Sequence, residues 1–177
     1  MKTTGTLIAA FGRQYEVRTD DTGEILLCVP RGKKSLFACG DRVQIAATGP
    51  GQGVIDKLLE RTSLLYRSDA WRQKLIAANA TQVVLVVATE PSFSDEFLSR
   101  CICAAESQHL KVLIVLNKID IVAGLEGARA QLATFAKLDY PILELSALDS
   151  ADALRARLIG ETSLLVGQSG MGKSTLT

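Results

Sequence analysis

Residues 163–174 read SLLVGQSGMGKS, a short apolar run followed at once by a glycine-rich loop. Residues 167–174 satisfy G-x-x-x-x-G-K-[ST], in which successive backbone N–H groups turn inward and form a nest for phosphate oxygens. In this motif the Lys173 ammonium reaches the β and γ phosphates, and the Ser174 hydroxyl ligates Mg²⁺. A glycine-rich loop can also merely join a strand to a helix. Here the loop directly follows a strand and ends in Lys173-Ser174, which favours phosphate binding. The predicted nucleotide contacts here are Gly167, Gln168, Ser169, Gly170, Met171, Gly172, Lys173, Ser174 and Thr175.

The tetrapeptide Asn117-Lys118-Ile119-Asp120 predicts which base is bound. The Asp120 carboxylate can accept hydrogen bonds from guanine N1–H and from the exocyclic amine. Adenine has no such amine and would leave the carboxylate unpaired, which is costly in a buried site. Asn117 is expected to tie its loop to the P-loop, and the Lys118 stem is expected to cover the base. Such a tetrapeptide also occurs as a plain polar turn, so the guanine prediction depends on its combination with the P-loop.

A third element, Ser146-Ala147, follows the apolar run 142–145, and a backbone N–H there is expected to donate to guanine O6. Between these motifs apolar runs of strand length alternate with segments of helical spacing. This alternation predicts a doubly wound α/β domain with a parallel sheet covered on both faces. The predicted strands are 83–88, 112–116, 142–145 and 163–166, and the predicted helices are 95–109, 125–138 and 151–158. The guanine loops precede the phosphate loop, whereas ordinary GTPases have the opposite order, so the domain is predicted to be circularly permuted.

The first third of the chain has a different texture, with short β-rich runs separated by turn residues. Five strands at this spacing predict a small closed barrel, for which the OB-fold is the commonest solution. The predicted strands are 4–10, 15–18, 24–29, 42–46 and 53–59. We therefore expect two domains, an OB-fold at residues 1–67 and the α/β domain at residues 68–177.

Composition narrows the class of protein further. With 47% hydrophobic and 22% charged residues, the chain can bury a real core, which excludes a wholly disordered or coiled-coil protein. No apolar run reaches the roughly 20 residues of a membrane helix, and no signal-peptide core follows Met1. We expect a cytoplasmic protein without a membrane partner. Four cysteines without a Cys-x-x-Cys pair, and a single histidine, argue against a zinc site in these residues.

Net charge is +1, but the first segment is mildly basic. Arg31, Lys33 and Lys34 lie in a predicted turn between barrel strands, where OB-folds bind nucleic acid with basic side chains for phosphates and aromatic rings for stacking. The candidate stacking residues are Phe11, Tyr15 and Phe37. The alternative is a solvated charged loop with aromatic rings in the core, and the residues alone favour that alternative.

A small barrel followed by a permuted GTPase domain resembles the ribosome small-subunit-dependent GTPase A family (RsgA/YjeQ). The resemblance covers the whole chain and includes residues 39–43 (CGDRV) and 76–82 (IAANATQ) besides the three nucleotide motifs. It implies a monomeric GTPase that uses Mg²⁺ with GTP or GDP, binds rRNA partly through its OB-fold, and acts late in maturation of the small (30S) ribosomal subunit.

The family continues past the P-loop with two switch segments and a C-terminal zinc module, whereas this sequence stops at Thr177. We therefore expect a fragment that hydrolyses GTP poorly by itself, and the sequence assigns no hydrolytic residue. A non-catalytic RNA-binding or ribosome-binding module with a guanine-nucleotide site stays open as the alternative. A P-loop ATPase is a third possibility, which conflicts with Asp120.

Overall fold

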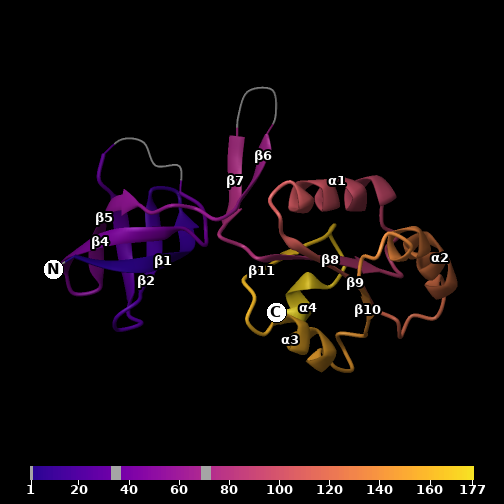
Figure 1. Cartoon of the computed structure of the whole chain (residues 1–177). Helices are drawn as coiled ribbons and strands as arrows, with labels where there is room; N and C mark the ends of the chain where they lie inside the picture. Colours follow the sequence, from indigo (N-terminus) through magenta and orange to yellow (C-terminus); the bar gives the residue numbers. More distant parts are fainter. Residues whose placement is uncertain (1, 33–36, 69–72) are drawn as a thin grey trace. The chain divides into compact units, whose positions relative to one another are not determined.

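The computed structural model describes residues 2–32, 37–68 and 73–177, and its contacts divide the chain into two units, residues 1–79 and 80–177 (Figure 1). The boundary expected from the sequence, after Arg67, falls inside a hairpin that groups with the first unit. Each unit has its own strands and its own buried residues, so each is described separately below.

The first unit contains a closed barrel of five strands, as the turn spacing predicts. Around the barrel the strand order is β1-β2-β3-β5-β4, and β1 closes the ring by pairing residues 2–6 with residues 42–46 of β4. Closure leaves no open sheet edge in the ring. The strands are β1 Lys2–Phe11, β2 Gln14–Thr19, β3 Ile25–Pro30, β4 Arg42–Gly49 and β5 Gln52–Leu58.

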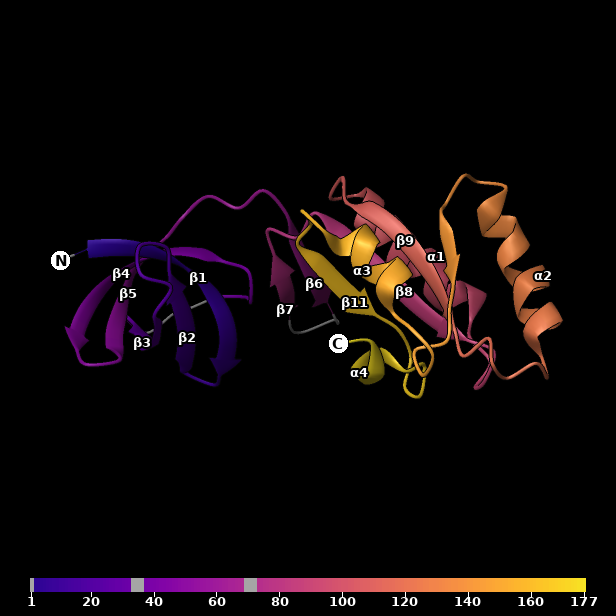
Figure 2. The same cartoon turned by 90° about the horizontal axis from the view of Figure 1, so that it is seen from below.

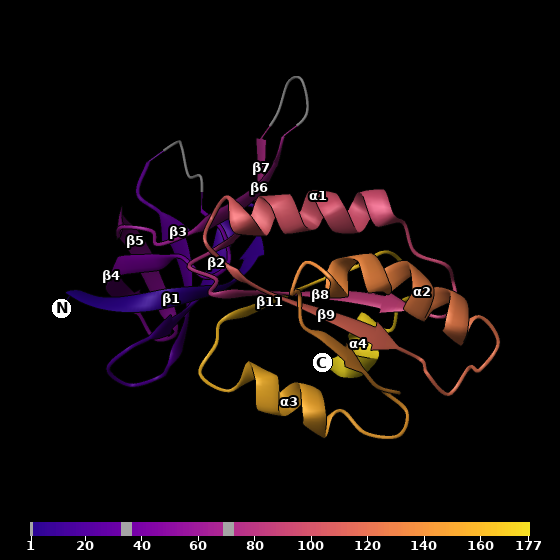
Figure 3. The same cartoon turned by 45° about the vertical axis from the view of Figure 1, so that its right-hand side comes forward.

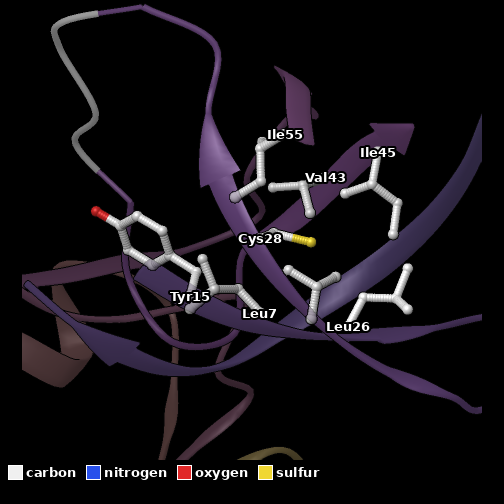
Figure 4. Packing of buried hydrophobic residues seen from close by; sticks show 8 residues of the cluster. Leu7, Tyr15, Leu26, Cys28, Val43, Ile45 and Ile55 are labelled. Carbon is white, nitrogen blue, oxygen red and sulfur yellow. The ribbon is translucent and has the colours of Figure 1, made fainter. Parts of the chain in front are cut away.

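The barrel core follows from the alternation of apolar residues along these strands, because alternate side chains point into the ring. Figure 4 shows side chains from each strand converging on the interior, with the Cys28 sulfur among them. The core residues are Leu7, Tyr15, Val17, Leu26, Cys28, Val43, Ile45 and Ile55. Phe37 packs edge-to-face against Tyr15 with ring centroids 5.4 Å apart.

A two-stranded hairpin, β6 Leu64–Ser68 and β7 Gln73–Ala78, follows the barrel and was not expected from the sequence. Its base is fastened to the barrel loop 39–40: the Ala78 N–H donates to Cys39 O at 2.9 Å, and Asn79 Nδ2 donates to Gly40 O at 2.9 Å. A Cβ at Gly40 would lie 2.0 Å from Ala78 O, so this close approach requires glycine.

The second unit is built on a parallel sheet in the order β10-β9-β8-β11. Its strands are β8 Gln82–Ala88, β9 Lys111–Asn117, β10 Ile142–Glu144 and β11 Ser163–Val166, and Figure 2 shows β11, β8 and β9 side by side. Every residue of β8 is buried, and so is β9 after Lys111. Continuous apolar runs of this kind are what a sheet covered on both faces requires.

Helices cover both faces of this sheet: α1 and α2 lie on one side, and α3 and α4 lie on the other (Figure 3). Their bounds are α1 Asp95–Glu106, α2 Leu125–Ala136, α3 Asp152–Leu158 and α4 Lys173–Leu176. The Ser94 hydroxyl caps α1 by accepting from the Phe97 N–H at 3.2 Å. Helix α1 ends before the predicted His109, which takes a positive φ of 54° as the chain turns toward β9. No helix within the described ranges is long and apolar enough to cross a membrane.

Candidate nucleotide-binding site

The predicted nucleotide motifs occupy three loops at the carboxyl ends of neighbouring strands. Residues 167–172 follow β11, residues 118–120 follow β9, and Ser146-Ala147 come shortly after β10. The carboxyl ends of parallel strands meet at one edge of the sheet, which is where open α/β sheets bind ligands. Motifs separated by up to 57 positions in the sequence are thereby gathered at one place.

Two glycines shape the P-loop through close approaches rather than through flexibility. A Cβ at Gly167 would lie 2.3 Å from Val86 O, so the loop leaves β11 in direct contact with the backbone of β8. Gly172 has a φ of +86°, and a Cβ there would lie 2.3 Å from Asn117 Nδ2. Only glycine satisfies both conditions at this second position.

The Asn117 carboxamide joins all three loops. Its Nδ2 donates to Met171 O at 3.0 Å, and its Oδ1 accepts from the Ala147 N–H at 3.0 Å. Asn117 is 1% exposed, and Met171 is equally buried. The expected tie from Asn117 to the P-loop is therefore present, and a second tie to the loop after β10 accompanies it.

Two lysines of the site donate to backbone carbonyls. Lys173 Nζ donates to Gly167 O and to Gln168 O, both at 2.8 Å. Lys118 Nζ donates to Glu90 O at 2.8 Å, and the Lys118 carbonyl accepts from the Thr89 hydroxyl at 3.1 Å. The Lys173 ammonium therefore spans the mouth of the P-loop, within reach of an anion that the loop would hold.

A cavity of about 220 Å³ opens between the P-loop and the loops after β9 and β10. Asp120 is exposed and lines this cavity, as the predicted contact with a base requires. The lining residues are Asn117, Lys118, Asp120, Ile121, Ser146, Ala147, Leu148, Gly172 and Thr175.

One of the two backbone donors considered for guanine O6 is already engaged in this structure, since the Ala147 N–H donates to Asn117 Oδ1. The neighbouring Ser146 hydroxyl is buried and has no hydrogen-bond partner among the described residues. Such a group is costly unless it is paired, and its place beside the cavity makes it a candidate partner for a ligand.

The loop that joins β8 to α1, residues 89–94, carries no motif that the sequence marks as part of the site. This loop meets both nucleotide motifs, because Glu90 O accepts from Lys118 and the Ser94 N–H donates to Gln168 Oε1 at 3.1 Å. Its position directly after the buried strand β8 was the available signal, since that strand ends at the same edge of the sheet.

The basic residues of the barrel are only partly covered by the structure. Lys33 and Lys34 lie outside the described residues. Arg31 forms an ion pair with Asp56, with 2.8 Å between Nε and Oδ1, and Lys2 lies 3.5 Å from Oδ2 of the same carboxylate. These three side chains line a shallow cavity of about 360 Å³ together with Gln44 and Lys57.

The predicted stacking residues of the barrel differ in exposure. Tyr15 is 5% exposed and Phe37 packs against it, so both rings contribute to the core. Phe11 is 60% exposed. Tyr15 and Phe37 therefore follow the alternative in which the aromatic rings lie in the core, and Phe11 is the exposed ring of the set.

Within residues 2–32, 37–68 and 73–177 no group of three or more His, Cys, Asp or Glu side chains is arranged to hold a metal ion. Ser174, the predicted Mg²⁺ ligand, lies exposed in the first turn of α4. Its hydroxyl oxygen is a ligand type that suits a hard cation such as Mg²⁺.

A P-loop that follows the Asn-Lys-x-Asp and Ser-Ala loops along the chain, on a sheet of this order in a chain that begins with a five-stranded barrel, defines a circularly permuted GTPase fold. Comparison with known proteins agrees. The family described as RsgA GTPase matches residues 58–177, and the chain belongs to that family.

Two relatives carry the name small ribosomal subunit biogenesis GTPase RsgA. The one from Nitrosospira multiformis is 54% identical over 172 residues, which are 97% of this chain and 55% of the relative. The one from Burkholderia pseudomallei is 52% identical over 176 residues, 97% of this chain and 56% of the relative. The chain therefore spans little more than half the length of these relatives.

Solved structures give the same fold. The crystal structure of YjeQ from Thermotoga maritima matches with a TM-score of 0.78 and 31% identity, covering 99% of this chain and 64% of that one. The structure of YloQ, described as a circularly permuted GTPase, matches with a TM-score of 0.72 and 24% identity, covering 99% of this chain and 63% of that one.

Proposed function

We propose that this chain binds guanine nucleotides with Mg²⁺ at the carboxyl edge of its parallel sheet, as part of a GTPase that acts in biogenesis of the small ribosomal subunit. The observation that carries the proposal is the Asn117 carboxamide, which joins the P-loop to the Ser146-Ala147 loop beside a cavity lined by Asp120. This arrangement sets a phosphate nest and a base-reading carboxylate on one rigid frame.

Each part of a nucleotide has a matching group in the site. Asp120 would accept from guanine N1–H and the exocyclic amine, while the Lys118 stem would cover the base. The P-loop amides would hold the phosphates, and Lys173 would exchange its two carbonyl partners for phosphate oxygens. Ser174 would hold Mg²⁺, which neutralises charge between the β and γ phosphates.

The proposed partner is the small ribosomal subunit with its rRNA, in the cytoplasm. Relatives at 54% and 52% identity are named for biogenesis of that subunit. The barrel would contribute basic contacts to the RNA backbone from Arg31, Lys33 and Lys34. The nucleotide state would then control docking, with the GTP form engaging the subunit and the GDP form leaving it.

Calorimetric titration with GDP and then ADP, in the presence of Mg²⁺, tests the nucleotide site. We expect GDP alone to bind, and we expect Lys173→Ala to weaken GDP binding strongly. Equal binding of GDP and ADP would contradict the guanine assignment, and absence of binding to either would contradict the site as a whole.

Binding to purified small subunits at several salt concentrations tests the RNA partner. Charge reversal at Lys33 and Lys34 is expected to weaken binding and to flatten its salt dependence, because fewer phosphate contacts release fewer counterions. Arg100→Glu on α1, outside the proposed surfaces, is the matched control. Unchanged affinity in the barrel variant would reject the RNA assignment. Subunit binding by the complete protein without any stimulated GTP turnover would favour the non-catalytic ribosome-binding module.

A further inference from the structure

The loop of residues 89–94 contacts the first half of the P-loop, residues 167–170. The Ser94 N–H donates to Gln168 Oε1 at 3.1 Å, and a Cβ at Gly170 would lie 3.3 Å from the Pro91 ring. Ser94 also begins α1 by capping the Phe97 N–H. The Gln168 side chain therefore links the P-loop directly to the amino end of this helix.

The two halves of the P-loop are held by different groups. Asn117 holds the second half through Met171 O, and this contact leaves the phosphate nest free. The first half is held by Lys173 Nζ at Gly167 O and Gln168 O, and by the Gln168 side chain at Ser94. Of these contacts, the two made by Lys173 use the same ammonium group that would bind a phosphate.

Nucleotide binding would redistribute these contacts. The lysine of this motif reaches the β and γ phosphates, and an ammonium has three N–H donors. Two phosphate contacts leave one donor at most for the two carbonyls. The first half of the loop would then depend on the hydrogen bond from the Ser94 N–H to Gln168 Oε1. Among the described residues, this is the side-chain hydrogen bond of residues 167–170 that does not involve Lys173.

We propose that Gln168 is a positioning residue for bound nucleotide, which fastens the first half of the P-loop to the start of α1 once Lys173 has moved to the phosphates. The inference rests on the proposed nucleotide site and adds a residue role to it. In the free chain Lys173 holds the same segment, so loss of the Gln168 contact affects the bound state more than the free one.

Release of a fluorescent, non-hydrolysable GTP analogue, which carries both the β and the γ phosphate, tests this role when it is followed by stopped flow. Gln168→Met keeps the length of the side chain and removes its acceptor. The matched control is Gln131→Met: Gln131 Nε2 donates to Phe93 O at 3.2 Å, so it holds the same loop from α2 without contacting the P-loop. We expect Gln168→Met to speed release roughly 3- to 10-fold, the usual worth of one hydrogen bond. Its association rate and the thermal midpoint of the free chain should match those of the parent.

The outcomes separate this role from a general structural one. Faster release in Gln168→Met, with the parent rate in Gln131→Met, supports the proposal. Parent release rates in both variants overturn it while leaving the proposed nucleotide site in place. Equal acceleration in both variants also overturns it, because loosening of the 89–94 loop would then be the cause. A parent chain that fails to bind the GTP analogue overturns the proposed function, and this inference with it.

Discussion

The loop 39–42 of the barrel unit and the loop 117–120 of the nucleotide unit each contain one aspartate, and the two carboxylates have opposite surroundings. Asp41 is fully buried, and its carboxylate accepts from Arg61 Nε and Nη2, both at 2.7 Å, and from the Ala38 N–H at 2.8 Å. Asp120 is exposed and lines a cavity. A carboxylate whose hydrogen bonds lie within the protein maintains the fold, whereas one turned toward a cavity is available to a ligand.

The carboxamides of the two units extend this comparison. Asn79 accepts from the Thr62 N–H at 2.8 Å and donates to Gly40 O at 2.9 Å, so it joins separate segments of the barrel unit. Asn117 joins loops in the same way. Both side chains position backbone, and Asn117 in addition lines a cavity of about 220 Å³.

The largest effect is expected for Arg61→Met, which leaves the Asp41 carboxylate buried without its cation. The hydrogen bond to the Asp41 carboxylate raises the pKa of the Arg61 guanidinium. Removing one partner of a buried pair costs about 3 kcal/mol or more. We expect the free energy of unfolding to fall by about that amount in urea, with Arg67→Met as the exposed control. A loss below about 1 kcal/mol, typical of a surface pair, would contradict the comparison.

Asp120→Ala should have the opposite profile, with binding lost and stability kept. Removal of hydrogen bonds to a charged group typically costs about 2–3 kcal/mol, or roughly 30- to 160-fold in GDP affinity. ADP binding and the unfolding midpoint should match those of the parent, because the Asp120 side chain is exposed. Glu96→Ala, an exposed carboxylate paired with Arg100, is the control. A large stability loss in Asp120→Ala would show that this carboxylate, too, maintains the fold.

The sequence predicted those parts of the molecule that depend on local chemistry. Continuous apolar runs identified β8 and β9, and alternation with turn residues identified the barrel. The predicted nucleotide loops could be located because each motif is a short run of neighbouring residues. The P-loop and the Asn-Lys-x-Asp tetrapeptide each directly follow a strand.

Contacts between distant residues could not be predicted in this way. Nothing near Asp41 in the sequence indicates Arg61 as its partner, and nothing near Gln168 indicates the Ser94 amide. The β6–β7 hairpin was missed because a register shift between Leu65 and Tyr66 interrupts the alternation, and because exposed Tyr66 and Ile76 obscure its faces.

A smaller, pH-dependent effect is expected at the opposite edge of the nucleotide unit. Glu161 pairs with Lys111 and accepts from the Thr81 hydroxyl at 2.5 Å, and these contacts lower the pKa of Glu161 below its ordinary value of 4.5. A lowered pKa stabilises the fold above pH 4.5, and that contribution is lost as the pH falls through the folded value.

Glu161→Gln should therefore lower the thermal midpoint slightly at pH 7, and the difference from the parent should vanish in acid. Salt should also reduce the difference, because the pair is near the surface. GDP affinity at pH 7 should be that of the parent, since this edge lies away from the base-reading loops. A difference that persists below the folded pKa would contradict the assignment to an ionised carboxylate.

The smallest effect, a change in thiol labelling on adding GDP, compares the two units directly. The structure holds all four cysteines as free thiols. Burial raises the pKa of Cys28 in the barrel core and of Cys101 on α1, whereas Cys103 is exposed. Iodoacetamide at pH 8 should label Cys103 first. GDP stabilises whatever binds it, so it should slow labelling of Cys101 severalfold and leave that of Cys28 unchanged, as read by site-resolved mass spectrometry. Equal protection of Cys28 and Cys101 would show that the barrel unit and the nucleotide unit open together. The two units would then share one free energy of unfolding, and Asp41 and Asp120 could not be assigned to units of separate stability.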